Sequence, residues 1–421
     1  MKKIFKYAML FFAACTLTTG FTACSDDDDD NNTNNTSNYN DRQYGQKAID
    51  DCANVADQLT TANSVIQQAD LTADQEAFLR NVLTNLVDNV IVPTYAELAE
   101  EAEDLEKTLN GLTVNTITQA QINDACEDFK EAREYWERSE AFLMGAASDF
   151  DIDPTIDSWP LNRTLLLNYF RGGMNDEMLE DATILGFHAL EFILFRDGQP
   201  RKVSEFKAND TYKNFENVTG AQELAYAQTI CTLLKQRCFQ LQVAWDGGKD
   251  ANRLNVVKAA GLDYTTENGL SYRDNLVNAG LDSKSTFRSL KAAVAQVLSD
   301  DEGSCVAIAN EVGTAKIANP FAAGDISYVE SPYSYNSISD FQDNIRSIRN
   351  VWQGSTNGSS ARYSFHEFFA STNNASTNNA VEGAYQSAIN SIGNMPAPFV
   401  KYCSTIWGIA FEDDEDWNVE E

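Results

Sequence analysis

Helical periodicity dominates this chain and limits what it can fold into. Apolar side chains recur every three to four residues over long segments, whereas few segments alternate with the period of two typical of β-strands. We therefore predict an all-α protein of two packed helical bundles with minor or no sheet. The predicted helices span residues 44–69, 74–109, 119–147, 161–170, 184–195, 222–245, 251–260, 272–298, 304–318, 338–352, 364–371, 381–391 and 398–411.

The chain is expected to contain a leader, a tether and two folded parts. We assign residues 1–23 to a signal peptide and residues 24–43 to an acidic, asparagine-rich tether that buries too little apolar surface to fold. The first bundle is predicted over residues 44–205 and the second over residues 206–421, because about 380 residues exceed what one hydrophobic core usually organises. A crossover that exchanges helices between the bundles is the alternative.

The N-terminus indicates export. Lysines precede an apolar stretch over residues 7–17 that is well short of the ~20 residues needed to span a bilayer. The small residues before Cys24 resemble a bacterial lipoprotein cleavage box with Cys24 as the lipidated residue, although Phe21 stands where leucine is usual. Asp26 to Asp30 resemble the surface-export signal of Bacteroidota lipoproteins. We expect a lipid-anchored outer-membrane protein exposed at the cell surface, with the periplasmic face as the alternative.

The charge balance restricts the partners of this chain. Its formal net charge is −32 at pH 7. Such a chain repels the phosphate backbone of nucleic acid, so we exclude nucleic acid as a partner. The same field concentrates cations and basic partners.

A polar pair lies inside the most apolar predicted helix, residues 184–195. His188 and Glu191 are three residues apart, so they share one helix face and can converge on one ligand. A buried carboxylate needs a partner, because removing its charge from water is costly. One interpretation is a metal or polar-ligand site, and the other is a hydrogen bond from a neighbouring helix. Gly186, taken as interior to the helix, indicates close approach of another group.

Two further segments carry polar side chains. Asp149, Asp151 and Asp153 alternate as in a calcium loop, but prolines replace the required glycine and glutamate, which leaves a solvated turn. The segment 330–341 is interpreted either as a loop that caps a helix at Ser337 or as the polar wall of a pocket. We expect the His188 and Glu191 pair to lie near this segment.

Chemical motifs are scarce elsewhere. No nucleophile elbow, phosphate-binding loop, dinucleotide fingerprint or HExxH helix is present. His366 has no glutamate three residues later and is expected to be a core or surface histidine. Hydrolytic chemistry therefore has no evident site in the sequence.

Four segments resemble the imelysin-like family. Residues 186–191 match its GxHxxE signature, and the segments 134–142, 157–162 and 330–344 resemble its Ser-Glu-Ala-Phe segment, its Trp-Pro loop and its C-terminal serine-rich loop and helix. The resemblance implies two four-helix bundles, export and a link to iron acquisition. It also implies metal ligation by His188 and Glu191. Further ligand or pocket residues would be Glu140, Glu330, Ser334 and Tyr335.

The expected cargo is iron or another divalent transition metal, or a ligand that carries one. One imidazole with several carboxylates suits iron, but zinc and manganese accept the same donors. Haem with His188 as an axial ligand is an alternative. The family was first described as a peptidase, so a surface metallopeptidase is a second functional hypothesis, disfavoured because the motif offers a single histidine. A metal-free binding or scaffold module is the third. The sequence names no iron-uptake partner protein.

Overall fold

The computed structural model describes residues 39–411. The predicted leader, the Cys24 lipidation site and nearly all of the tether lie outside these residues, so those assignments stay predictions. Among the described residues, none of the helices is long and apolar enough to cross a membrane.

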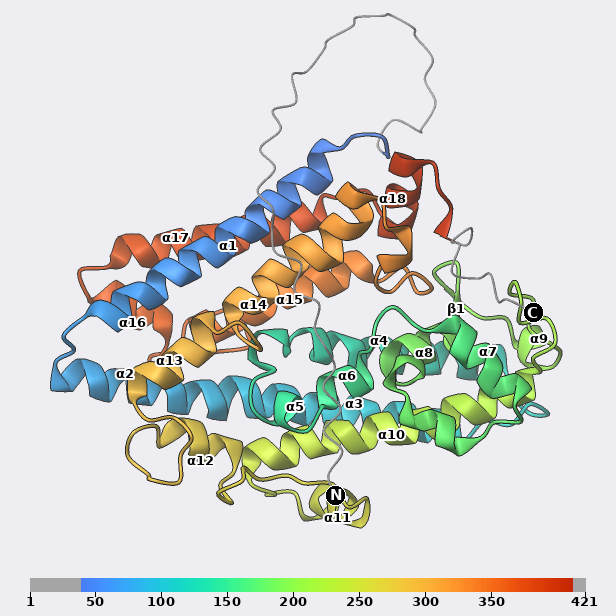
Figure 1. Cartoon of the computed structure of the whole chain (residues 1–421), viewed down its shortest axis with the longest axis horizontal. Coiled ribbons are helices and arrows are strands. Elements are labelled where there is room, and N and C mark those ends of the chain that lie inside the picture. The colour runs from blue at the N-terminus through green and yellow to red at the C-terminus, as the bar shows by residue number, and fades with distance from the viewer. Residues whose placement is uncertain (1–38, 412–421) are drawn as a thin grey trace, which may run out of the picture. The chain divides into compact units, whose positions relative to one another are not determined.

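Helices account for nearly all of the regular structure in this part of the chain (Figure 1). The prediction of an all-α fold with minor sheet is confirmed. A two-residue hairpin pairs β1 (Phe195–Arg196) with β2 (Gln199–Pro200). The α-helices are α1 (Gln43–Gln68), α2 (Ala73–Leu86), α3 (Val92–Asn110), α4 (Gln119–Glu137), α5 (Ala146–Asp149), α6 (Ile152–Ile156), α7 (Arg163–Arg171), α8 (Gly186–Leu194), α9 (Val203–Phe206), α10 (Gly220–Asp246), α11 (Ala251–Ala259), α12 (Tyr272–Val277), α13 (Leu290–Ser299), α14 (Cys305–Glu311), α15 (Ser337–Gln353), α16 (Phe365–Ser371), α17 (Ala375–Gly393) and α18 (Phe399–Trp407).

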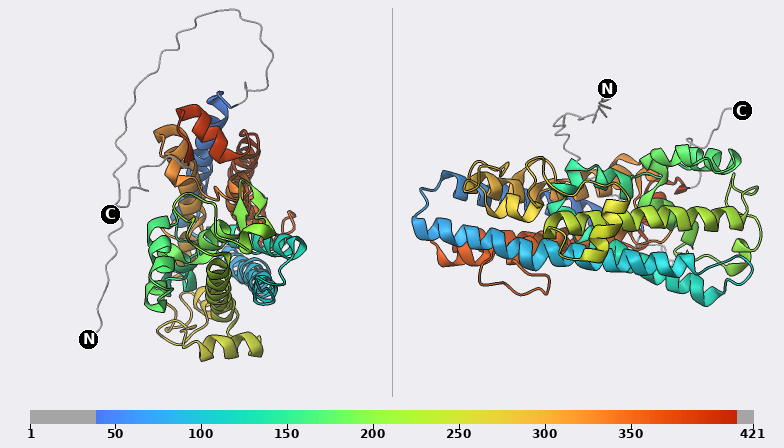
Figure 2. Two further views of the ribbon diagram at one scale, coloured as in Figure 1. Left: turned by 90° about the vertical axis from the view of Figure 1, so that its right-hand side faces the viewer. Right: turned by 90° about the horizontal axis from the view of Figure 1, so that it is seen from below.

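Short 3₁₀-helical and π-helical segments connect these α-helices. The π-helical segments are η1 (Val87–Ile91) and η5 (Val312–Ala323), and the 3₁₀ segments are η2 (Glu140–Phe142), η3 (Asp176–Glu180), η4 (Ala182–Ile184) and η6 (Ile326–Tyr328). The first π-helical segment lies between α2 and α3, which continue one another as a long rod in the right panel of Figure 2.

Helices from each side of the predicted boundary at residue 205 pack against helices from the other side. The N-terminal helix α1 packs against α17, α13 and α14, whereas α10 from the second half packs against α3 and α8. The right panel of Figure 2 shows α10 running beside the α2 and α3 rod. Helices are therefore exchanged between the two halves of the sequence, as in the crossover alternative. The division into two domains itself stays a prediction.

Local chemistry explains where several long helices begin. At the starts of α2, α4 and α10, a threonine side chain accepts a hydrogen bond from the backbone N–H of a glutamine three residues later. The glutamine side chain in turn accepts a hydrogen bond from the backbone N–H of the threonine. These capping boxes satisfy backbone groups that a helix leaves unpaired. The threonines are Thr72, Thr118 and Thr219.

Two predicted helices are shorter than expected. The helix predicted over 119–147 ends at Glu137, and Gly145 then adopts a φ of 72° that no continuing helix allows. The helix predicted over 272–298 is split into α12 and α13. The connection turns at Gly280 and is held by Asn275, whose side chain bonds the backbone and hydroxyl of Thr286. Apolar residues on both sides of this loop mimic one continuous helix.

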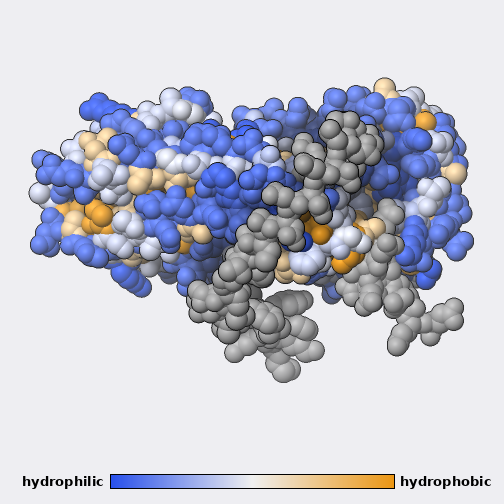
Figure 3. Space-filling view, turned by 90° about the horizontal axis from the view of Figure 1, so that it is seen from above, coloured by the Kyte–Doolittle hydropathy of each residue, from blue (hydrophilic) through white to orange (hydrophobic). Residues whose placement is uncertain are grey.

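The outer surface is mostly hydrophilic. Figure 3 shows blue residues over most of the face seen from above, with only small hydrophobic areas between them. Among the described residues, the exposed large hydrophobic side chains are Leu281, Trp407 and Ile409. All six cysteines in this part of the chain are buried free thiols.

Candidate metal centre

Helix α8 carries the polar pair and is buried along its whole length. Gly186 is its first residue and not an interior one, which corrects our expectation. Its φ is 72°, and a Cβ there would lie 2.0 Å from the carbonyl oxygen of Ile156. Only glycine allows this approach, so the close contact inferred from the sequence is present, and it is made by backbone.

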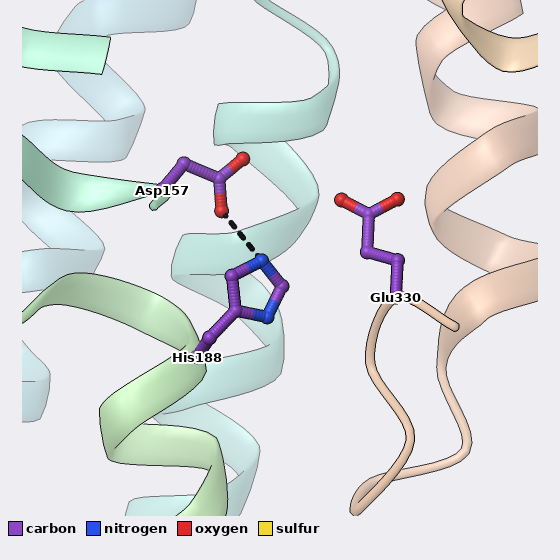
Figure 4. Close-up of side chains that lie close together, drawn as sticks. All are labelled: Asp157, His188 and Glu330. Atoms are coloured by element: carbon purple, nitrogen blue, oxygen red, sulfur yellow. Dashed lines mark ion pairs between the residues drawn. The ribbon is translucent and has the colours of Figure 1, made fainter. Parts of the chain in front are cut away.

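His188 lies between two carboxylates. Its Nε2 is 3.1 Å from Asp157 Oδ1, and its Nδ1 is 3.7 Å from Glu191 Oε2. Figure 4 shows the imidazole directed toward Asp157, with Glu330 facing the pair from another segment. Burial alone would lower the pKa of His188, but the carboxylates of Asp157 and Glu191 outweigh it and raise the pKa to about 9.

Glu191 holds the segment before α15. Its Oε1 accepts hydrogen bonds from the backbone N–H groups of Tyr333 and Ser334, at 3.0 and 2.7 Å, and from Ser334 Oγ at 2.6 Å. The predicted proximity of Glu191 to the segment 330–341 is therefore confirmed. These donors supply the partner that a buried carboxylate requires.

Arg133 forms ion pairs with three carboxylates that come from different parts of the chain. This guanidinium is 1% exposed and contacts Asp157, Glu137 and, at 2.7 Å, Glu330 Oε1. Trp136 Nε1 donates to the other oxygen of Asp157 at 2.6 Å. Burial acts to raise the pKa of Asp157, but Arg133 and His188 outweigh it and hold the pKa well below its usual range.

Lys316 brings a second buried cation. Its Nζ is 3.1 Å from Glu330 Oε1 and 3.8 Å from both Glu137 and Glu140. It lies on the π-helical segment η5, where Pro320 has no N–H to donate to an α-helical ladder. π-Helical turns recur at functional sites because they redirect side chains. Burial raises the pKa of Glu137 and of Glu140 despite this lysine.

Three ligand-type side chains converge in this network. Asp157, His188 and Glu330 can each place one ligand atom within 4.8 Å of the others, and Glu137, Glu140 and Asp157 form a second such group. Among residues 39–411, several buried polar atoms have no hydrogen-bond partner, and five of them belong to this network. They are Arg133 Nε, Glu137 Oε1, Glu191 Oε2, Glu330 Oε2 and His188 Nε2, whose contact with Asp157 lacks hydrogen-bond alignment. Carboxylate oxygens and a deprotonated imidazole are ligands of borderline transition metals, so a metal ion that binds here would displace the proton that the raised pKa leaves on His188.

The predicted site residues are only partly brought together. His188, Glu191, Glu330 and Ser334 are linked as described above, and Glu140 lies in the same buried network through Lys316 and the second group. Tyr335 is elsewhere: its hydroxyl donates to Asp197 Oδ1 at 3.2 Å, and Lys401 lies over its ring. Ser337 is not the helix cap, because Asn336 occupies that position and Ser337 Oγ donates to the carbonyl of Glu330.

Arg133, Asp157 and Lys316 were not predicted as site residues from the sequence. A signal for Arg133 was available, because Arg133 and Glu137 are four residues apart on one helix face and Glu140 follows three residues later. Asp157 stands in the Trp-Pro loop, where an acidic residue is usually solvated. Nothing in the sequence around Lys316 predicts that an ammonium group is buried there.

A cavity of about 390 Å³ reaches His188 from outside the network. Its walls combine aromatic rings with Arg163, which lies over the Phe411 ring. The aromatic residues are Trp159, Tyr333 and Phe411. His188 is therefore not sealed inside a bundle, because its side chain lines this space, whereas Glu191 is not among the described residues that line it.

Comparisons with known proteins identify the family. The family model described as Imelysin matches residues 91–415, about three quarters of the chain. This chain belongs to the imelysin family. An iron-regulated protein A from Synechococcus elongatus is 26% identical over 280 residues, and the match covers 66% of each chain, just under two thirds of that relative.

A solved structure confirms the fold. A crystal structure described as an iron-regulated protein A precursor from Parabacteroides distasonis superposes with a TM-score of 0.60 at 22% identity. It covers 81% of this chain and 97% of that one. At this identity the likeness establishes the shared fold alone.

Proposed function

We propose that this imelysin family member binds a transition metal ion, with iron as the first candidate, or a ligand that carries one, at Asp157, His188 and Glu330. We further propose that it is an exported lipoprotein anchored through Cys24 and exposed at the cell surface, where it serves iron acquisition. The convergence of the three ligand-type side chains carries the proposal. Relatives described as iron-regulated support iron as the cargo.

The buried cations can coexist with a metal. Glu330 contacts Arg133 and Lys316 through Oε1, which leaves Oε2 without a hydrogen bond among the described residues. One carboxylate can thus face a metal with one oxygen and the cations with the other. The arginine then orients the carboxylates, as outer partners of metal ligands commonly do.

Glu191 has a supporting role in this proposal. Its Oε1 is occupied by the 333–334 backbone, and its Oε2 faces His188 Nδ1 at 3.7 Å. A carboxylate beside the second ring nitrogen fixes the orientation of a metal-binding imidazole. The assignment of Glu191 as a ligand therefore becomes, in our proposal, a positioning role.

Titration of the mature chain with ferrous, ferric and zinc ions tests the proposal. We expect His188→Ala and Glu330→Gln each to weaken binding by at least about tenfold, which is about 1.4 kcal/mol. His366→Ala is the matched control, because His366 bonds Glu382 at 2.9 Å outside this network. Equal binding by all these variants and the unmodified chain would contradict the site.

A further inference from the structure

The cavity at His188 has an unusual charge for this chain. Acidic residues outnumber lysines and arginines by 63 to 31 in the whole sequence. Among the described residues that line the cavity, however, there is no aspartate or glutamate, and the basic side chains are Arg163 and His188. A space walled in this way favours an anion, although the net charge of the protein repels one.

Arg163 is oriented by its neighbours and can be reached from the cavity. Its Nη1 donates to the Tyr212 hydroxyl at 3.1 Å, and its guanidinium carbon lies 5.3 Å from the centroid of the Phe411 ring. The residue is half-buried and lines the cavity. A guanidinium has five N–H donors in a planar fork, so a group oriented in this way can also bind a carboxylate through two parallel hydrogen bonds.

The start of α7 adds further donors. Asn162 is the N-cap of this helix, Arg163 and Thr164 are its first two residues, and all three line the cavity. The side-chain oxygen of Asn162 accepts a hydrogen bond from the Leu165 N–H at 2.9 Å, and its amide nitrogen is a donor. The positive end of the helix dipole lies at these residues and also favours negative charge.

His188 connects the cavity with the metal site. Its side chain is 3% exposed and lines the cavity, and its Nε2 makes no aligned hydrogen bond to any residue in the range 39–411. A metal ion held at His188 would therefore lie next to the molecule that occupies the cavity. Carboxylate oxygens are themselves metal ligands, so an anion with several carboxylates could bring the ion with it.

Two hydroxyl oxygens in the lining are placed as hydrogen-bond acceptors. Ser327 Oγ donates to Asp325 Oδ1 at 2.6 Å, and Thr183 Oγ1 donates to Asp181 Oδ1 at 2.5 Å. These contacts use the hydroxyl protons, and the oxygen lone pairs can accept a hydrogen bond from a ligand hydroxyl. Both residues are half-buried and line the cavity.

We propose that the cavity at His188 binds a small polycarboxylate that also carries a hydroxyl group, of the chemical class of citrate, as the ligand that brings the metal ion. This inference rests on the proposed function, which assigns the metal to Asp157, His188 and Glu330. Arg163 binds one carboxylate, the start of α7 attracts the remaining negative charge, and the ligand hydroxyl donates to Ser327 or Thr183. The cavity volume of about 390 Å³ lies in the range of small-molecule sites.

Calorimetric titration of the metal-free mature chain with citrate tests this inference. Citrate is compared with propane-1,2,3-tricarboxylate, which has the carboxylates but no hydroxyl, and with inorganic phosphate, which is an anion without carboxylates. We expect citrate to bind about fivefold more tightly than the tricarboxylate, which is about 1 kcal/mol and corresponds to one hydrogen bond. We expect it to bind at least about tenfold more tightly than phosphate, because phosphate cannot contact both Arg163 and the hydroxyl oxygens.

Variants separate the contributions. Arg163→Gln should weaken citrate binding at least about tenfold, and Arg163→Lys should weaken it less, because lysine keeps the charge but not the fork. Arg171→Gln is the matched control, since Arg171 is an exposed arginine at the end of the same helix and outside the described lining, and it should change binding less than about twofold. Glu330→Gln should not weaken citrate binding by the metal-free chain, whereas it weakens metal binding, so failure here and failure of the metal site are distinguishable.

Three results would overturn the inference. They are no citrate binding up to about 10 mM, a ligand concentration equivalent to less than about 3 kcal/mol of binding, equal affinity for citrate and phosphate, and equal losses from Arg163→Gln and Arg171→Gln. Equal affinity for citrate and propane-1,2,3-tricarboxylate would overturn the requirement for a ligand hydroxyl.

Discussion

Removing the Glu191 carboxylate should release the segment before α15. Glu191→Ala leaves the N–H groups of Tyr333 and Ser334 buried without an acceptor, and each unsatisfied group costs about 1 to 3 kcal/mol. The Ser334 hydroxyl can rotate toward another acceptor and adds no cost, so the two N–H groups together give an expected loss of about 2 to 6 kcal/mol. Glu191→Gln keeps an acceptor oxygen of the same reach and should cost about 1 kcal/mol, the loss of charge assistance.

Two measurements on the metal-free protein test this prediction. Urea unfolding monitored by tryptophan fluorescence gives the stability of each variant, and hydrogen exchange of the 333–334 amides reports local opening. We expect the exchange of these amides to accelerate strongly in Glu191→Ala and little in Glu191→Gln. Equal stability loss in both variants would refute the reasoning, because the two differ mainly in the acceptor oxygen.

Three further substitutions follow from particular contacts. Gly186→Ala should lower the melting temperature markedly, since the residue combines a φ of 72° with backbone contact at 2.0 Å, and a melt equal to that of the unmodified chain would contradict this. Burial and the nearby Glu131 raise the pKa of Glu101 to about 7, so native stability is lost as pH rises from the unfolded pKa toward 7. Glu101→Gln should therefore raise the melting temperature at pH 8 and leave it unchanged below about pH 4, where the unmodified side chain is protonated in both states. Lys316→Met should cost about 3 to 5 kcal/mol in urea unfolding, because buried carboxylates lose their cation, and adding Glu330→Gln should recover part of that loss.

The helices could be predicted because their signals are local. A capping box at Thr118 begins one helix and another at Thr219 begins a second. These boxes, like the spacing of apolar residues within each helix, can be recognised without tertiary information. The break between α12 and α13 escaped prediction because Asn275 stabilises the loop through contacts with Thr286 that only the folded chain brings together. Periodicity alone does not distinguish such a loop from a helix.

From periodicity alone, the site was predictable only where it lies within one helix, whereas Glu140, Glu330 and Ser334 were named through the family resemblance. His188 and Glu191 share a face of α8 and stand out against apolar neighbours. Asp157, Arg133 and Lys316 come from a loop, an amphipathic helix and a π-helical segment, in which charged residues are usually solvated. Their burial follows from tertiary packing, which also brings the backbone of residues 333–334 to Glu191.

Anomalous diffraction from crystals of the mature chain soaked with ferrous ions tests the metal site most directly. Data collected on both sides of the iron absorption edge locate bound iron independently of the protein atoms. Our proposal predicts an iron peak within bonding distance of His188 and of oxygens from Asp157 and Glu330. A peak confined to His366 and Glu382 or to exposed carboxylates, with none at His188, would contradict it.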